Sequence, residues 1–71
     1  MDFVSNAEAT NRIKSLRVRK GLTQAEIAEK LGVSTKVYIR YENQPYDVPI
    51  KRYQQIADIL GCKASDFFVA Y

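Results

Sequence analysis

The segment from Leu22 to Ser34 constrains the fold of this chain more than any other. Thr23 is followed three residues later by Glu26, the spacing of a capping box, in which a hydroxyl and a carboxylate satisfy free amides at a helix start. Gly32 lies where the turn after this helix needs a residue that tolerates a left-handed backbone. Ser34 has the side chain to cap a second helix directly after that turn. The segment therefore predicts two short helices joined by a tight turn.

Length and composition narrow the possible functions. With 71 residues the chain is expected to be a single domain spanning residues 1–71. It has no histidine, which removes the commonest general base and a frequent metal ligand, and its one cysteine, Cys62, leaves no internal disulfide. Neither a nucleophile motif nor a phosphate-binding loop is present. We therefore expect no enzyme, no metal, no cofactor and no small-molecule substrate.

The compartment follows from the same composition. No apolar run approaches the roughly 18 residues of a membrane span, and no secretory leader is recognisable. The single cysteine fits a reducing environment. We therefore expect a cytoplasmic protein without membrane contact.

The charge of the chain favours a polyanionic partner only mildly. The formal net charge is +3, from 11 basic and 8 acidic residues. Its distribution is more informative, because five cations fall within nine residues without an acid: Arg12, Lys14, Arg17, Arg19 and Lys20. A solvated helix face and a phosphate-facing helix explain this run about equally well.

Apolar spacing and turn residues predict the remaining helices. Ser5 and Glu8 have capping-box spacing, and Ala9 and Ile13 begin a buried stripe at helical intervals. Two prolines mark a loop over residues 43–49. Residues 1–4 are expected to fray. The chain is thus expected to be all-α and compact, with helices at about residues 6–20, 23–31, 35–43, 50–60 and 65–68.

Several motifs recur together in a defined order: Lys20–Gln24, Ile27–Ala28, Leu31–Ser34, Arg40–Asn43, Ile56–Gly61 and Asp66–Phe68. In this order and spacing they resemble the Cro and repressor family of lambdoid phage and bacterial helix-turn-helix regulators. The resemblance covers about residues 12–68. It implies the five-helix lambda-repressor-like fold, with a helix-turn-helix unit at about residues 23–43 whose second helix lies in the DNA major groove.

The resemblance also assigns roles to single residues. Gln24 matches a glutamine that touches a phosphate and braces the second helix, and Arg40 matches a base reader able to pair with guanine O6 and N7. Arg17 and Glu42 match a structural ion pair, so Arg17 is not expected to contact DNA. The implied DNA contacts are Gln24, Ser34, Thr35, Lys36, Ile39, Arg40, Asn43, Lys51 and Arg52.

Three features depart from the family pattern. Residues 37–39 are Val-Tyr-Ile, where relatives carry small polar residues at the first and third positions. We expect Tyr38 to point into the core and Ile39 to be exposed, on a thymine methyl or within a protein-binding patch. The loop after this helix has Asp47 and few cations, which lowers the expected affinity for phosphate. The third feature is the apolar end of the chain. Phe67 or Phe68 is expected to complete the core, and the other apolar residues at this end are expected to be exposed.

Two functions remain in view. The first is a Cro-like repressor that binds its operator as a homodimer, in a bacterial or phage-infected cell. The second is a small temperate-phage modulator or antirepressor that binds the DNA-binding domain of a partner repressor. The protein interface it would need consists of Val37, Tyr38, Ile39, Phe68 and Tyr71. The sequence favours the first function.

Overall fold

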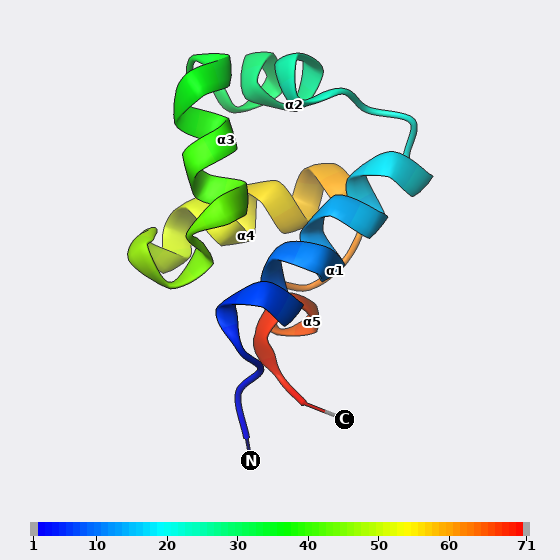
Figure 1. Cartoon of the computed structure of the whole chain (residues 1–71). Coiled ribbons are helices and arrows are strands. Elements are labelled where there is room, and N and C mark those ends of the chain that lie inside the picture. The colour runs from blue at the N-terminus through cyan, green and yellow to red at the C-terminus, as the bar shows by residue number, and fades with distance from the viewer. Residues whose placement is uncertain (1, 71) are drawn as a thin grey trace.

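The structure is a computed structural model that describes residues 2–70 (Figure 1). These residues form α1 (Asn6–Arg19), α2 (Gln24–Leu31), α3 (Thr35–Asn43), the 3₁₀ turn η1 (Pro45–Asp47), α4 (Ile50–Leu60) and α5 (Ser65–Phe68). The all-α class and the five expected helices are confirmed, and most helix ends lie within a residue of the predicted ones. The predicted loop after α3 contains η1.

Side-chain oxygens begin the first three helices as their sequences predict. Ser5 Oγ accepts a 3.2 Å hydrogen bond from the Glu8 amide, which is the hydroxyl half of the predicted capping box. The Glu8 carboxylate instead lies 3.5 Å from Arg12 Nε. Thr23 and Glu26 form the full capping box, with bonds of 3.1 and 3.0 Å. The Thr23 amide that donates to the Glu26 carboxylate lowers the pKa of that carboxyl group. Gly32 ends α2 with a φ of +76°, the left-handed conformation that its position requires.

One hydrophobic core joins the helices. Its buried side chains come from α1 to α5: Ala9, Ile13, Ile27, Ala28, Tyr38, Tyr53, Ile56, Ala57, Leu60, Phe67 and Phe68. Rings of α4 and α5 meet edge to face, with the Tyr53 and Phe68 centroids 4.9 Å apart. In Figure 1, α2 and α3 lie at one end of the molecule, and α5 and the two chain ends lie at the other.

The prediction that the first four residues fray is wrong for residues 2–4. The Val4 amide donates to the Phe68 carbonyl at 2.8 Å, and the Ala70 amide donates to the Asp2 carbonyl at 2.9 Å. Phe3 and Val69 thereby form an isolated antiparallel bridge, while residues 2–70 contain no longer strand. The fold brings these distant segments together, so their backbone groups bond to each other.

Within residues 2–70, no helix combines the length and the apolar character needed to cross a membrane.

Candidate nucleic-acid interface

The α3 helix presents one polar side to solvent. Ser34 caps the helix by accepting a 3.2 Å hydrogen bond from the Val37 amide. Thr35, Lys36 and Arg40 are all exposed, and the last two lie one helical turn apart. Within residues 2–70, neither Lys36 nor Arg40 has an ion-pair partner, so both charges are available to a ligand.

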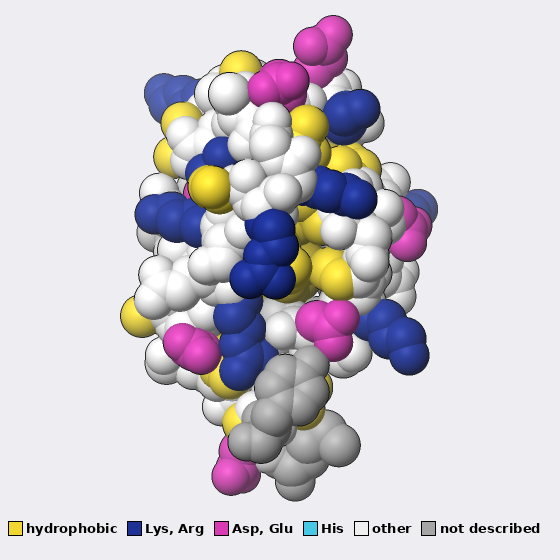
Figure 2. Space-filling view, turned by 90° about the vertical axis from the view of Figure 1, so that its right-hand side faces the viewer, with side chains coloured by type: hydrophobic (Ala, Val, Ile, Leu, Met, Phe, Trp, Pro, Cys, Tyr) yellow, Lys and Arg dark blue, Asp and Glu magenta, His cyan; other side chains and the backbone are white. Residues whose placement is uncertain are grey.

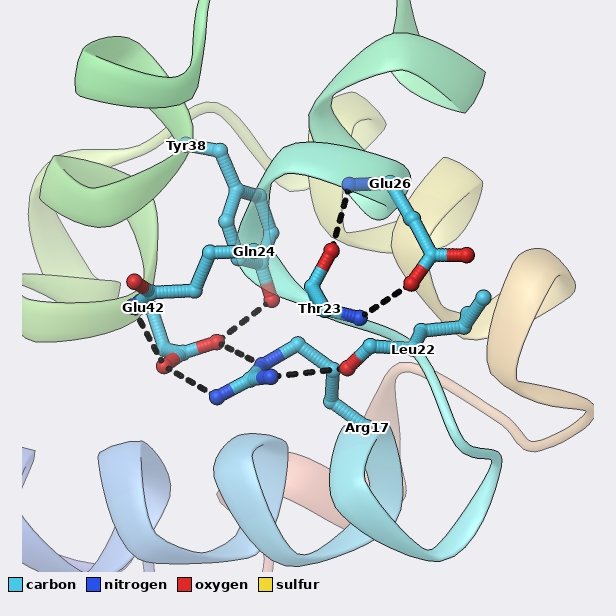
Figure 3. A network of polar contacts seen from close by, with 7 residues as sticks. All are labelled: Arg17, Leu22, Thr23, Gln24, Glu26, Tyr38 and Glu42. Atoms are coloured by element: carbon cyan, nitrogen blue, oxygen red, sulfur yellow. Dashed lines mark hydrogen bonds and ion pairs between the residues drawn. The ribbon is translucent and has the colours of Figure 1, made fainter.

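The opposite side of α3 is fixed by a buried carboxylate (Figure 3). Glu42 is 1% exposed, and Arg17 of α1 reaches it with Nε 2.9 Å from Oε2. Gln24 Nε2 donates to Glu42 Oε1 at 3.2 Å, and the Tyr38 hydroxyl donates to Oε2 at 2.7 Å. Arg17 Nη1 also donates to the Leu22 carbonyl at 2.8 Å. The expected ion pair is therefore present, and it ties α1, α2 and the segment between them to α3.

This arrangement makes the orientation of α3 dependent on Glu42. A buried charge is tolerated because several donors satisfy it, and removing one partner of such a pair costs about 3–5 kcal/mol. Burial raises the pKa of the Tyr38 hydroxyl, and its hydrogen bond to Glu42 raises it further. Tyr38 therefore remains a protonated donor across the physiological pH range.

Gln24 is the first residue of α2 and lies half-buried against this network. A glutamine amide nitrogen carries two N–H donors. One of them is directed to Glu42, which gives Gln24 the bracing part of its expected role. A second donor remains at the N-terminus of α2, where backbone amides and the helix dipole favour an anion.

The sequence of most of the chain matches a family model. The family model HTH_3, described as helix-turn-helix, matches residues 13–67. The chain belongs to this helix-turn-helix family. The matched residues include α2 and α3, which the turn at Gly32 joins.

Curated proteins similar to this helix-turn-helix domain come from archaea. An uncharacterised HTH-type transcriptional regulator of Methanocaldococcus jannaschii is 39% identical over 59 residues, covering 83% of this chain and 89% of the relative. One from Archaeoglobus fulgidus is 31% identical over 58 residues, covering 82% of each chain. Family and relatives together make this chain a transcriptional regulator with a helix-turn-helix DNA-binding domain, and not an enzyme.

Solved structures share the fold. A hypothetical transcription factor, NHTF from Neisseria, has a TM-score of 0.79 at 19% identity and aligns with 97% of this chain and 84% of its own. HppE in its Fe(II) form has a TM-score of 0.81 at 18% identity, but the alignment covers only 35% of the HppE chain. At these identities the likeness shows the fold alone.

Within residues 2–70, no cluster of His, Cys, Asp or Glu could hold a metal ion.

The remaining expected DNA contacts lie at and beyond the end of α3. Asn43 and Lys51 are exposed, in the last turn of α3 and the first turn of α4. Arg52 is half-buried, and its Nη1 donates to Gln55 Oε1 at 3.1 Å. Asp47 of η1, which lies between Asn43 and Lys51 in the chain, is also exposed. α3 therefore carries Thr35, Lys36 and Arg40 together, while Lys51 and Arg52 lie on α4.

Several interface expectations require correction. Tyr38 and Phe68 are buried, so the protein-binding role considered for them is wrong, while the core position expected of Tyr38 is correct. Ile39 is half-buried instead of exposed, because it follows Tyr38 at the border between the packed and exposed sides of α3. Val37 is exposed, and Tyr71 lies outside the described residues. The apolar surface expected for a partner repressor is therefore largely absent from α3.

The basic run of α1 does not form one phosphate-facing stripe. Arg17 is directed to α3, whereas Arg12 Nη1 donates to the Val69 and Asp66 carbonyls at 2.7 and 3.1 Å, at the end of α5. Lys14 and Arg19 remain exposed. Figure 2 shows Lys and Arg side chains down the middle of the face that lies at the right of Figure 1. α3 is drawn at the left of Figure 1, so these cations lie away from the exposed side of α3.

Sequence reasoning missed contacts both within the Glu42 network and at the end of α5. The bond from Tyr38 to Glu42 joins residues four apart on one helix, a spacing that places side chains together and was available as a signal. The bonds from Arg12 to the end of α5 span more than fifty residues, and no local pattern announces them.

Proposed function

We propose that this chain is a sequence-specific repressor of the Cro type that inserts α3 into the major groove of its operator. The observation that carries the proposal is the two-sided character of α3. Thr35, Lys36 and Arg40 are exposed on one side, while Glu42 fixes the other side to α1 and α2. A helix with such a side fits the major groove, where base edges display a distinct pattern of donors and acceptors.

The side chains on and beside the exposed side of α3 contact the bases and the backbone of the operator. The Arg40 guanidinium pairs with guanine O6 and N7, which is worth about 1–3 kcal/mol of discrimination against another base. Lys36 contacts guanine or a phosphate, and Thr35 lies beside it at the start of the helix. Half-buried Ile39 contacts a thymine methyl from the edge of this side.

Phosphate contacts fix the position of α3. Gln24 donates its second amide N–H to a phosphate at the N-terminus of α2, and the backbone amides after Ser34 lie at the start of α3. Asn43, Lys51 and Arg52 hold the backbone beyond the end of α3. Two copies on one operator place two α3 helices in successive major grooves and so exclude polymerase.

Selection of binding sites from a library of random duplexes tests this function. We expect the wild-type protein to enrich two inverted half-sites about one helical turn apart, each containing a guanine. Arg40→Ala is expected to lose the preference for that guanine while its circular dichroism spectrum is unchanged. Arg19→Ala, which removes an exposed cation from α1, is the matched control and is expected to enrich the wild-type sequence. The absence of any enriched sequence with the wild-type protein would contradict the proposal.

A further inference from the structure

The side of α1 that faces away from the core carries exposed cations. Its exposed residues recur at three- and four-residue steps along the helix: Asn11, Lys14, Ser15, Val18 and Arg19. We call these five residues the α1 face. Val18 is 65% exposed. Among the residues that the structure describes, neither Lys14 nor Arg19 has an ion-pair partner, so both charges are available to a ligand.

Two adjoining hollows lie along the α1 face. Lys14, Ser15, Val18 and Arg19 line the first, which has a volume of about 500 Å³. The second, of about 410 Å³, lies between α1 and α5, and half-buried Leu16 lines it together with Ser15 and Arg19. Figure 2 shows hydrophobic surface beside the column of Lys and Arg side chains. The α1 face therefore offers apolar surface next to charges, instead of charges alone.

The two carboxylates near the α1 face are already engaged. Glu8 Oε1 lies 3.5 Å from Arg12 Nε, and Asp66 Oδ2 accepts a 3.1 Å hydrogen bond from the Lys63 amide. Both acids line the hollow between α1 and α5, and neither lines the hollow at Lys14. The part of the α1 face at Lys14 is therefore positive, and the charge becomes mixed toward α5.

We propose that the α1 face binds an acidic, amphipathic segment of a partner protein. Carboxylates of this segment pair with Lys14 and Arg19, and an apolar side chain of the segment covers Val18. The paired charges orient the segment and speed its association, while burial of apolar surface stabilises the complex. The contact is small, so we expect a dissociation constant on the order of 100 µM at low salt.

A peptide fits this surface better than a nucleic acid does. Duplex DNA carries one negative charge for about every 1.7 Å of its axis, so a duplex laid along α1 sets phosphates against Glu8 and Asp66. A peptide carries separate charges and places an acid only where a cation lies. Phosphates also leave the side chain of Val18 uncovered, whereas an apolar residue of a peptide buries it.

The α1 face is separate from the exposed side of α3. Arg17 is the residue of α1 that extends to α3, where it pairs with Glu42, and it is not part of the α1 face. α3 is drawn at the left of Figure 1, and α1 extends to the right. A partner on the α1 face therefore leaves Lys36 and Arg40 accessible, and its binding does not depend on DNA at α3.

An NMR titration of the whole chain with a designed peptide tests this surface. The probe is a helical peptide of about 14 residues, with a stripe of Leu along one side and Glu on both sides of that stripe. Its control has the same composition in scrambled order. Amide shifts locate the contact, and their dependence on peptide concentration gives the dissociation constant. We expect the ordered peptide to shift the amides of the α1 face, and the scrambled one to bind at least about threefold more weakly.

Removing charge from two different helices separates the α1 face from the net charge of the chain. Lys14→Gln combined with Arg19→Gln is expected to weaken peptide binding about fivefold or more, because two exposed ion pairs are lost. Lys36→Gln combined with Arg40→Gln removes two exposed cations from α3 and is the matched control. We expect the control to change peptide binding by less than about twofold. All four positions are exposed, so both variants keep the fold.

The apolar part of the contact is tested with two valines. Val18→Ser is expected to weaken peptide binding about threefold, since less apolar surface is buried. Val37→Ser, at an exposed valine of α3, is its control and is expected to bind as the wild type does. Equal effects of the two substitutions would contradict the proposed position of the apolar side chain.

A titration with a DNA duplex of unrelated sequence decides between the two classes of polyanion. A duplex that shifts the amides of the α1 face as strongly as the peptide does would overturn the proposal in favour of a nucleic-acid surface. The proposal is also overturned by equal binding of the ordered and scrambled peptides, or by no saturable shift below about 1 mM peptide. The peptide titrations contain no DNA, so their result is independent of operator binding.

Discussion

The Tyr38 hydroxyl donates a 2.7 Å hydrogen bond to the buried carboxylate of Glu42, one turn later on the same helix. Both side chains lie on the side of α3 that faces the core, while Arg40 between them is exposed. The helix that carries the proposed base readers is therefore held through a polar anchor of its own, to which α1 and α2 contribute Arg17 and Gln24.

Removing the Tyr38 hydroxyl tests this anchor. We expect Tyr38→Phe to lower the free energy of unfolding by about 2 kcal/mol, because a hydrogen bond to a buried charge is lost without a change of shape. Urea unfolding measures the difference. Tyr46→Phe, which removes a hydroxyl from an exposed tyrosine, is the control and is expected to cost less. Equal losses in the two variants would contradict a special role for the buried hydroxyl.

The ion pair between Arg17 and Glu42 is expected to show strong non-additivity. Arg17→Met leaves a buried carboxylate without its cation and is expected to cost about 3–5 kcal/mol. Arg17→Met combined with Glu42→Met removes both charges, so we expect the double variant to be less destabilised than the sum of the two single variants. Thermal unfolding followed by circular dichroism measures all four proteins. Simple additivity would mean that the two charges do not depend on each other.

The turn at Gly32 is expected to discriminate between two substitutions. Its φ of +76° is the left-handed conformation, in which an alanine is strained by about 1–2 kcal/mol. No other atom lies within 4 Å of the position of an added Cβ, so the cost comes from the backbone and not from a clash. Gly32→Asn is expected to be less destabilising than Gly32→Ala, because asparagine tolerates this conformation. Chemical denaturation that ranks the two variants in the opposite order would contradict this explanation.

The capping box of α2 predicts a pH dependence. The pKa of the Glu26 carboxyl is lowered in the folded chain, first by the Thr23 amide, from an unfolded value of 4.5. The stability that this carboxylate contributes to the fold is therefore complete above pH 4.5, and it is lost as the pH falls through the lower pKa of the folded chain. Glutamine also serves in a capping box, so Glu26→Gln is expected to resemble the wild type at pH 7 and to lose less stability on acidification.

Urea unfolding at pH 7 and pH 3 measures the effect of Glu26→Gln. Glu29→Gln, on an exposed residue of the same helix, changes the net charge equally and is the control. The control is expected to lose as much stability on acidification as the wild type. An identical pH dependence in all three proteins would show that the Glu26 carboxylate is not a cap in solution.

Local chemistry was sufficient to predict most of the fold. The caps at Ser5, Thr23 and Ser34 and the turn at Gly32 depend on residues a few positions apart, and each was predicted from the sequence. Thr35, Lys36 and Arg40 were expected from the family resemblance, and helical spacing places Lys36 and Arg40 one turn apart.

Contacts between distant segments were beyond such reasoning. The pairing of residues 2–4 with residues 68–70 and the capping of α5 by Arg12 depend on the tertiary fold. Phe68 was considered for a protein interface because it lies near the end of the chain, yet α4 and η1 cover it. Phe3 lines the same surface hollow as Tyr46 and Ile50, more than forty residues later in the chain, so no sequence window contains this hollow.

The most direct measurement is a fluorescence anisotropy titration of the purified protein against DNA from the intergenic region upstream of its own gene, at low and moderate salt. For three to five phosphate contacts we expect a steep fall in affinity with salt, with a slope of about −0.9 per phosphate. We also expect the wild-type protein and Arg19→Ala to prefer this duplex to one of unrelated sequence, and Arg40→Ala to lose that preference. Equal affinity of the wild-type protein for both duplexes, or no binding at low salt, would contradict the assignment of α3 as the helix that reads an operator.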